Sequence, residues 1–307
     1  MSISVKGVSK LYETQKALNN VSFEIKSGEI VGFLGPNGAG KTTMMKILTC
    51  FIPPSEGEAW VCGFNIFEYP IKIRKRIGYL PENNPLYLDM YVKEYLSFIA
   101  GIHNLGKQSK DSIKNIIHKT GLEKEQHKKI GALSKGYRQR VGLSQALIHN
   151  PDVLILDEPT SGLDPNQVLE IRELIKEIGQ NKTIMLSTHI MREVEAICDR
   201  VIIIDNGQIV ADKSINELQH IIKQKQYAVS VEFDKAIPEG QLRQISAVKH
   251  VESTGHNKWK IEVGSDADIR SEIFNLAVKN NAVVLSLSKA ELSLEEVFQF
   301  LTKNKPS

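Results

Sequence analysis

Apolar and polar positions alternate over much of residues 3–34, which is the spacing of half-buried β-strands. Residues 21–25 show this pattern, and a glycine-containing turn follows them. Residues 29–34 are a short apolar run that leads into a glycine-rich loop, and residues 41–50 then have the spacing of a helix. The chain is therefore expected to begin with strands that lead, through this loop, into a helix.

The middle of the chain is expected to contain a parallel sheet covered by helices. The pattern from about residue 70 to 150 is mostly helical, with breaks at prolines and glycines. Short apolar strands then alternate with amphipathic helices, which favours a parallel sheet with helices on its faces. The strands are residues 153–156, 183–187 and 201–205, and the helices lie near residues 165–179 and 190–198.

The character of the sequence changes after about residue 215. Residues 219–226 are polar and contain lysines, as a helix end or a linker does. Beyond them the pattern runs strand, helix, strand, strand, helix, strand, which is the order of a ferredoxin-like α+β unit. We therefore expect a large domain at residues 1–218, with a helical subdomain at about 85–150, and a small C-terminal domain at residues 225–303.

Composition narrows the class of protein without identifying a function. The 307 residues are 41% hydrophobic and 24% charged, which is ordinary for a globular protein. The net charge of +3 is small and the basic residues are dispersed, so no nucleic-acid partner is expected. No apolar run approaches the ~20 residues that cross a bilayer, and the first residues do not resemble a signal peptide. The expected location is cytoplasmic, with Cys50, Cys62 and Cys198 as reduced thiols.

A phosphate-binding loop is predicted where the first apolar strand meets the helix. Glycines let the backbone curl until successive N–H groups point at phosphate oxygens, and the helix N-terminus adds positive charge. Lys41 is expected at the β- and γ-phosphates of a nucleotide, the Thr42 hydroxyl on Mg²⁺, and Thr43 at the α-phosphate. The loop consists of Gly35, Pro36, Asn37, Gly38, Ala39, Gly40, Lys41 and Thr42, which fit the P-loop pattern.

A chance glycine-rich turn is the alternative interpretation of this loop. From average residue usage, the P-loop pattern alone is expected by chance in roughly one chain in a hundred of this length. Its position between a predicted strand and a predicted helix is the context that a P-loop requires, and it argues against chance.

Two adjacent carboxylates, Asp157 and Glu158, follow the apolar strand at residues 153–156. A strand buried on both faces is expected to end this way only at a site, although two exposed acids at the start of a loop are the simpler alternative. With the P-loop upstream, Asp157 is expected to hold Mg²⁺ and Glu158 to polarise the attacking water. His189 ends the next strand, so we expect it at the γ-phosphate, although a single histidine there is usually a surface or packed residue.

Between the P-loop and the acids the chain reads Leu133-Ser134-Lys135-Gly136-Tyr137-Arg138-Gln139-Arg140, and Ser161-Gly162-Leu163-Asp164 follows the acids. The first of these segments closely resembles the signature sequence of ABC ATPases. The resemblance covers residues 1 to about 215, with the motifs in the order of the family. It implies an α/β fold: a P-loop NTPase domain with a parallel core sheet, an antiparallel β subdomain and a helical subdomain, here followed by a small α+β C-terminal domain.

The resemblance also implies a dimer with composite sites. Tyr12 matches the aromatic residue that stacks on adenine. Ser134 and Gly136 match the signature residues that meet the γ-phosphate bound to the opposite subunit. Asp164 matches the loop that crosses the dimer interface. Two ATP molecules would then be sandwiched between two copies of this chain.

The activity that the family implies is ATP hydrolysis coupled to transport. Glu158 matches the catalytic base and His189 the switch histidine. Binding of ATP would close the homodimer, hydrolysis would reopen it, and closure would pull on a transmembrane permease encoded as a separate chain. We expect the closing motion to reach the permease through the helical segment 85–130 and the loop at Glu82.

Three positions depart from the commonest pattern of the family. Lys135 replaces a glycine and Tyr137 a glutamine of the signature. Glu82 stands where the family usually has glutamine, and a carboxylate can bind Mg²⁺ but cannot donate a hydrogen bond as an amide does. Because the P-loop lysine, both acids and the histidine remain, hydrolysis is expected to survive.

The signature, the loop at Glu82 and the tail at residues 292–298 look like those of multidrug, ABC-2-type exporter ATPases with a small C-terminal domain. More narrowly, the chain is similar to gliding-motility-associated ATP-binding subunits. The C-terminal domain has no visible catalytic set, so dimer contact or regulation is expected of it.

Two other functions are weighed against the transport ATPase. A soluble ABC-type ATPase acting on DNA would need a long coiled-coil insertion, but only about ninety residues without sustained heptads separate the P-loop from the signature. The ribosome-acting type carries two ATPase cassettes, and this chain has one. A non-catalytic regulatory subunit would have a degenerate site, which the acids and His189 argue against.

Overall fold

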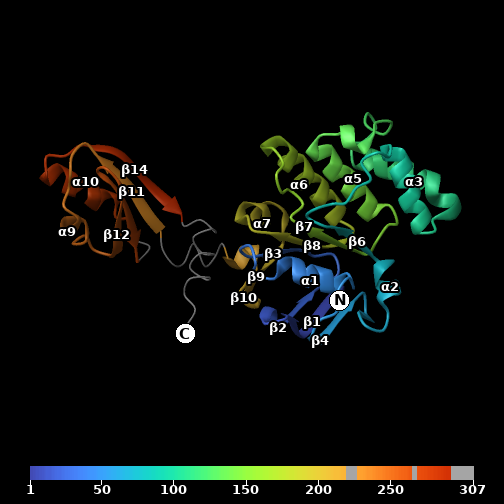
Figure 1. The fold of residues 1–307 in the computed structure, drawn as a ribbon. Coiled ribbons are helices and arrows are strands. Elements are labelled where there is room, and N and C mark those ends of the chain that lie inside the picture. The colour runs from blue at the N-terminus through green and yellow to red at the C-terminus, as the bar shows by residue number, and fades with distance from the viewer. Residues whose placement is uncertain (219–226, 265–267, 292–307) are drawn as a thin grey trace. The chain divides into compact units, whose positions relative to one another are not determined.

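The computed structural model describes residues 1–218, 227–264 and 268–291. The chain divides into two compact units, Met1–Lys213 and Ser214–Ser307, which are described separately below (Figure 1). The predicted linker at residues 219–226 and the tail at residues 292–298 lie outside the described residues.

A four-stranded antiparallel sheet forms one layer of the first unit, with the strand order β2-β1-β4-β5. Its inward-facing residues, such as Ile3 and Val5 of β1, are buried, and their neighbours Ser4 and Lys6 are not. This alternation confirms the half-buried strands that the start of the sequence predicts. The strands are β1 (Ile3–Tyr12), β2 (Gln15–Ile25), β4 (Glu56–Val61) and β5 (Phe64–Asn65).

A six-stranded sheet forms the centre of the unit, in the order β10-β9-β3-β8-β7-β6. The pairs β9–β3, β3–β8, β8–β7 and β7–β6 are parallel. Every residue of β3, β7 and β8 is buried, as expected of strands with both faces covered. Parallel strands end at one edge of the sheet, so the residues after β3, β6, β7 and β8 gather there. The strands are β3 (Ile30–Leu34), β6 (Ile77–Leu80), β7 (Val153–Asp157), β8 (Thr183–Thr188), β9 (Arg200–Asp205) and β10 (Gln208–Ser214).

Helix α1 (Lys41–Leu48) lies between the two sheets. Its Met44, Met45, Ile47 and Leu48 are fully buried, in the same core cluster as Phe33 of β3. Burial of each such side chain contributes about 1.5–3 kcal/mol. The helix that begins at the glycine-rich loop is therefore fixed firmly against the parallel sheet.

The remaining helices of the unit cover the parallel sheet or form a helical subdomain. Helices α3, α4 and α5 make up the helical subdomain, which the chain enters after β6 and leaves before β7 (Figure 1). Their bounds are α2 (Pro70–Arg74), α3 (Val92–Ile102), α4 (Ser109–Lys119), α5 (Lys135–Leu147), α6 (Pro165–Gly179) and α7 (Met191–Ile197), with 3-10 turns at Gly106–Gln108 and Ile130–Ala132.

Strand β6 lies in a stretch that the hydrophobic pattern predicts as mostly helical, so the prediction was wrong at these four residues. A strand of this length has too few positions to show a periodicity. Gly78 explains how it fits, since a Cβ there would lie 2.1 Å from the carbonyl oxygen of Ala146 in α5. The strand can pack this closely against the helix only because the residue is glycine.

The second unit is an α+β structure with a four-stranded antiparallel sheet, in the order β12-β13-β11-β14. Val229, Val231 and Phe233 of β11 share its core with Ile261 of β13 and Ile273 of α10. The α+β character predicted for this part of the chain is confirmed. The elements are β11 (Tyr227–Phe233), α9 (Glu239–Leu242), β12 (Val248–Gly255), β13 (Lys258–Val263), α10 (Arg270–Lys279) and β14 (Val284–Glu291).

We expect Phe233→Ala to destabilise the second unit by about 3–5 kcal/mol, because truncation of this fully buried side chain leaves a cavity. The matched control is Phe274→Ala, since Phe274 is 55% exposed and its truncation should change the free energy of unfolding by about 0.5 kcal/mol or less. Urea unfolding of the full chain measures both. Equal effects of the two variants would contradict the core described here.

Candidate functional site

The loop between β3 and α1 has a backbone shape that depends on its glycines. Gly38 and Gly40 have φ angles of 81° and 104°, in the region that favours glycine. A Cβ on Gly40 would lie 2.6 Å from the carbonyl oxygen of Ala17 in β2, and one on Gly35 would lie 2.3 Å from that of Ile204 in β9. The loop is therefore pressed against both sheets, with no room for a larger residue at Gly35 or Gly40.

Lys41, the first residue of α1, is a buried cation with a side-chain exposure of only 7%. Its ammonium group donates to the carbonyl oxygens of Gly35 at 2.8 Å and Pro36 at 3.2 Å. It also lies 3.5 Å from Oε1 of Glu158. A buried charge is stable only when it is paired, and these three partners match the three donors of an ammonium group. The loop is thus wrapped around its own lysine.

Asp157 and Glu158, at the end of β7, face different surroundings. Asp157 is 1% exposed and accepts a 2.5 Å hydrogen bond from the Ser187 hydroxyl of the neighbouring strand. Glu158 has a φ of 49°, which is uncommon for a residue other than glycine. Its amide donates to the same Ser187 hydroxyl at 3.0 Å. This sharp turn separates the two carboxylates, and strained backbone of this kind is concentrated at functional sites.

The Glu158 carboxylate contacts the side chains of both Lys41 and His189. Lys41 lies on one side, and Nδ1 of His189 lies 2.9 Å from Oε2. The carboxylate is 9% exposed, whereas the His189 side chain is 46% exposed. These three residues follow three adjacent parallel strands, which is why residues so far apart in sequence meet here.

Glu193 of α7 holds the segments on both sides of this cluster, and no sequence motif predicts it. It is 2% exposed, and its carboxylate accepts hydrogen bonds from the hydroxyls of Thr188, at 2.6 Å, and Thr160. Thr160 follows Glu158 by two residues, and Thr188 precedes His189. One feature of the sequence does mark Glu193: it is an acid at a position that the amphipathic pattern assigns to the buried side of a helix.

These elements enclose a cavity of about 620 Å³, the P-loop cavity, at the carboxyl edge of the parallel sheet. Gln15, Ala17 and Ser161 also line it and were not predicted. Gln15 is opposite Tyr12 in the β1–β2 hairpin, so the strand pairing brings both to the cavity. The predicted residues that line it are Tyr12, Asn37, Gly38, Gly40, Lys41, Thr42, Thr43, Glu82, Glu158 and His189.

Four other predicted residues do not line the P-loop cavity, although they belong to its surroundings. Gly35, Pro36 and Ala39 supply loop backbone, including the carbonyls that hold the lysine. Asp157 is buried at the end of its strand, against Ser187.

The signature residues and Asp164 also lie outside the P-loop cavity of their own chain. Ser134 is the N-cap of α5, and its hydroxyl accepts from the amide of Tyr137 at 3.4 Å. Asp164 is the N-cap of α6. A Cβ on Gly136 would lie 2.6 Å from the side chain of Gln167 in α6, so these two helix N-termini are neighbours.

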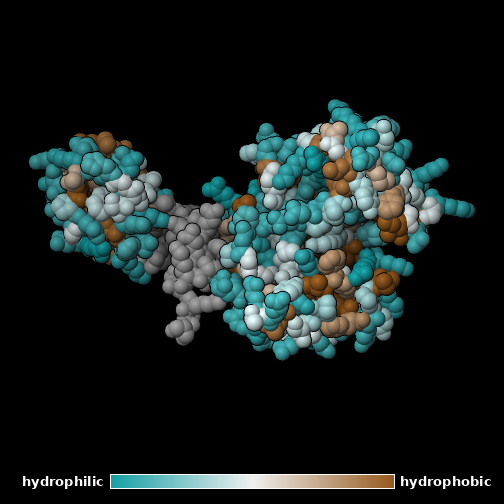
Figure 2. Space-filling view, in the orientation of Figure 1, coloured by the Kyte–Doolittle hydropathy of each residue, from teal (hydrophilic) through white to brown (hydrophobic). Residues whose placement is uncertain are grey.

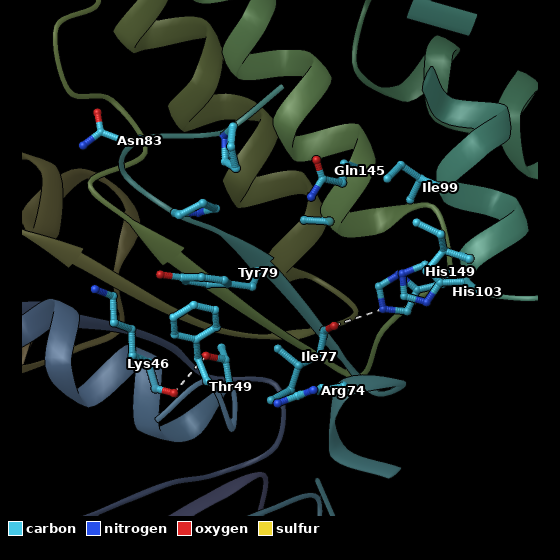
Figure 3. A pocket seen from close by; sticks show the side chains of 15 residues that line it. Lys46, Thr49, Arg74, Ile77, Tyr79, Asn83, Ile99, His103, Gln145 and His149 are labelled. Atoms are coloured by element: carbon cyan, nitrogen blue, oxygen red, sulfur yellow. Dashed lines mark hydrogen bonds between the residues drawn. The ribbon is translucent and has the colours of Figure 1, made fainter. Parts of the chain in front are cut away.

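A second cavity, of about 600 Å³, lies between the helical subdomain and α1, and we call it the α1–α3 groove (Figure 3). Tyr79 of β6 forms part of its floor. The loop after β6 contributes to both cavities: Glu82 lines the P-loop cavity, whereas Pro81, Asn83 and Pro85 line the groove. One short loop therefore connects the two.

Comparison with known proteins identifies the family. Residues 18–161 match the ABC transporter family. The bacitracin transport ATP-binding protein BcrA of Bacillus licheniformis is 34% identical over 298 residues, which cover 96% of this chain and 95% of BcrA. This chain belongs to the ABC transporter ATP-binding proteins. YxlF, an uncharacterised ABC transporter ATP-binding protein of Bacillus subtilis strain 168, is 32% identical over 297 residues, or 96% of this chain and 98% of YxlF.

A solved structure of an ABC ATPase has the same fold. It is the ATP-binding cassette MJ0796 in a dimeric post-hydrolysis state, bound to ADP and Pi, with a TM-score of 0.65 and 27% identity over 69% of this chain and 98% of that one. The chain is thus an ATP-binding and ATP-hydrolysing subunit of an ABC transporter that powers a separate transmembrane permease. None of the helices within the described residues is long and apolar enough to cross a membrane.

We expect Gly40→Ala to weaken ATP binding by at least tenfold, because a Cβ there meets the carbonyl of Ala17 and forces the P-loop to change shape. Gly63→Ala is the control: its φ of 78° is similarly strained, but its Cβ would meet nothing within 4 Å and it lies outside the cavity. Titration of each variant with a fluorescent ATP analogue measures the affinity. An unchanged affinity in Gly40→Ala would contradict the assigned loop geometry.

Proposed function

We propose that this ABC transporter subunit works as a head-to-tail homodimer, hydrolyses MgATP at two composite sites, and drives export through its permease. The observation that carries the proposal is the cluster of Lys41, Glu158 and His189 at the P-loop cavity. It combines a cation for phosphates, a carboxylate that can accept a proton, and an imidazole within hydrogen-bond distance of that carboxylate.

In the proposed mechanism Lys41 changes partners when nucleotide binds. Its ammonium group now contacts two backbone carbonyls and Glu158, and phosphate oxygens would replace these contacts. Glu158 would then be free to orient water and accept its proton. His189 would hold the Glu158 carboxylate in place and contact the γ-phosphate. Tyr12, 44% exposed beside the cavity, would stack on adenine.

The residues at this site fit a magnesium ion. Thr42 offers a hydroxyl oxygen, and Asp157 and Glu82 offer carboxylate oxygens, which are the hard ligands that Mg²⁺ prefers. Among the described residues Ser187 is the donor to Asp157, and it occupies one carboxylate oxygen. The second oxygen is left for a metal-bound water. The ion would neutralise charge on the transferred phosphate.

The head-to-tail homodimer is supported by residues that lie outside their own P-loop cavity. Ser134 and Gly136 are at the N-terminus of α5, where backbone N–H groups favour an anion. Asp164 starts the neighbouring helix α6. In the proposed dimer these residues complete the cavity of the partner subunit, and a dimeric arrangement is described for the MJ0796 cassette.

The α1–α3 groove is the proposed docking site for the permease. Apolar side chains gather on the surface over α3 and beside α1, as Figure 2 shows. Phe51 and Ile102, both lining the groove, are exposed large hydrophobic residues. The loop at Glu82 contacts both the P-loop cavity and this groove, so a change around the γ-phosphate could be transmitted directly to the permease.

Three further parts of the proposal rest on family membership. The chain would lie at the inner face of the cell membrane, attached through its permease. BcrA, a bacitracin transport protein by name, supports a transporter of antibiotic-like cargo but does not define the cargo here. The second unit would be an accessory domain for dimer contact or regulation. None of the relatives described above is named for gliding motility, and the proposed function does not depend on that resemblance.

We expect Glu158→Gln to bind ATP but to hydrolyse it about 10²–10⁴-fold more slowly, because an amide cannot accept the proton of the attacking water. The variant should also accumulate as an ATP-bound dimer, which size-exclusion chromatography with light scattering detects. Glu68→Gln, a change at an exposed residue, is the control. Phosphate release by Glu158→Gln at the wild-type rate would exclude Glu158 as the base.

We expect Lys41→Ala to weaken ATP binding by about 10–100-fold, because charge-assisted hydrogen bonds of about 1.5–3 kcal/mol are lost. Isothermal titration calorimetry measures the loss, and Lys26→Ala, at an exposed residue, is the control. Thermal unfolding without nucleotide separates this loss from misfolding. Wild-type affinity in a folded Lys41→Ala protein would overturn the P-loop assignment.

A further inference from the structure

The buried carboxylate of Glu193 contacts the turn that carries Glu158. In this turn, which follows β7, the amide of Ser161 donates to the carbonyl oxygen of Glu158 at 3.1 Å. Thr160 lies inside the turn, and its hydroxyl donates to Oε1 of Glu193. Because the turn begins at Glu158, this hydrogen bond restrains the backbone that directs the Glu158 carboxylate.

The second carboxylate oxygen of Glu193 contacts the turn that carries His189. The amide of Ile190 donates to the Thr188 hydroxyl oxygen at 3.0 Å, so this hydrogen bond spans His189. The same hydroxyl donates to Oε2 of Glu193 at 2.6 Å. One carboxylate therefore holds both turns, and the 2.9 Å contact of His189 with Glu158 forms between the side chains that these turns carry.

The burial of Glu193 shows why this position needs a carboxylate. Glu193 is 2% exposed, and its nearest cation is the guanidinium of Arg172 in α6, with Nη2 4.0 Å from Oε1. An acid is almost never buried to this degree unless its charge is compensated. A glutamine would fill the same space, but it has one acceptor oxygen and one donor nitrogen, so it could not accept from both hydroxyls. A carboxylate can hold both turns at once.

We propose that Glu193 is a positioning residue for ATP hydrolysis, which fixes the His189 turn relative to the Glu158 turn. The inference rests on the proposed function, because it takes Glu158 as the base and His189 as the group that holds it. Glu193 does not line the P-loop cavity, so it acts through the two threonines. A displacement of about 1 Å in a catalytic group can slow a reaction by about 10²-fold. A purely structural role would instead lower the stability of the protein and leave the rate of the folded fraction unchanged.

The test removes each threonine hydroxyl with little change in side-chain volume. We expect Thr160→Val and Thr188→Val each to lower kcat by about 10–100-fold. The KM for ATP should change by less than about threefold, because neither hydroxyl lines the P-loop cavity and the loss falls on the chemical step. Thr160→Ser and Thr188→Ser keep the hydroxyl and should restore most of kcat. Phosphate release by the full chain measures kcat and KM, and titration with a fluorescent ATP analogue measures affinity.

Thr183→Val is the matched control. Thr183 begins β8, the strand that Thr188 ends, and it is 2% exposed. Its hydroxyl is 2.8 Å from that of Ser2 and accepts from the amide of Gly28 at 3.0 Å. The control therefore also loses two hydrogen bonds of a buried hydroxyl, but at the opposite end of the strand. Thermal unfolding should show a similar loss of stability in Thr183→Val and Thr188→Val, whereas only Thr188→Val should lose kcat.

Glu193→Gln tests the shared carboxylate directly, and its kcat should fall as in the valine variants. If it does not fold, the valine and serine variants still decide the question. Wild-type kcat in both folded valine variants would overturn the positioning role, and so would an equal kcat loss in Thr183→Val or serine variants as slow as the valine ones. The proposed function would stand in these cases as long as Glu158→Gln is slow. Hydrolysis by Glu158→Gln at the wild-type rate would overturn the proposed function and this inference together.

Discussion

The buried contact between Lys41 and Glu158 is the interaction on which the site depends. It joins the first turn of α1 to the end of β7, and it places opposite charges 3.5 Å apart where water is largely excluded. Removing either partner would leave a buried charge unpaired, which is far more costly than the pair itself is stabilising. In the proposed mechanism, an arriving phosphate would supply negative charge to Lys41 and release Glu158. The same contact would thus hold the site together and make it responsive to nucleotide.

The parallel sheet is what allows this contact to form. Lys41, Glu158 and His189 follow β3, β7 and β8, and these strands are neighbours that end at one edge. Helix α1 is locked between two sheets by its buried methionines, so the lysine cannot move away from that edge. Glu193 adds a second restraint, because it binds threonines beside both Glu158 and His189. Rigid elements therefore carry the chemistry, and the turns between them aim the side chains.

Much of this could be predicted from the sequence where the determining signal is local. The P-loop, the acids of Asp157 and Glu158 and the fully buried strands are each defined by a few consecutive residues. β6 could not be predicted, because it is four residues long and its Gly78 is explained only by contact with α5. Glu193 was missed because one of its partners, Thr160, lies 33 residues away in sequence. The α1–α3 groove was invisible for the same reason: its sides come from helices that meet only in the folded chain.

The loop after β6 contains a buried amide that the structure leaves without a hydrogen-bond partner among the described residues. Asn84 lies in this loop, between Glu82 and the groove, and both polar atoms of its amide are buried without a partner among the described residues. Its nitrogen would lie 2.0 Å from a Cβ on Gly142, so the amide is pressed against α5. Each unsatisfied buried group costs about 1–3 kcal/mol. A small shift of α5 relative to β6 that offered Asn84 a partner would recover part of that cost. Glu82 lines the P-loop cavity two residues earlier. In the proposed function, nucleotide would therefore act on one end of this loop and the permease on the other.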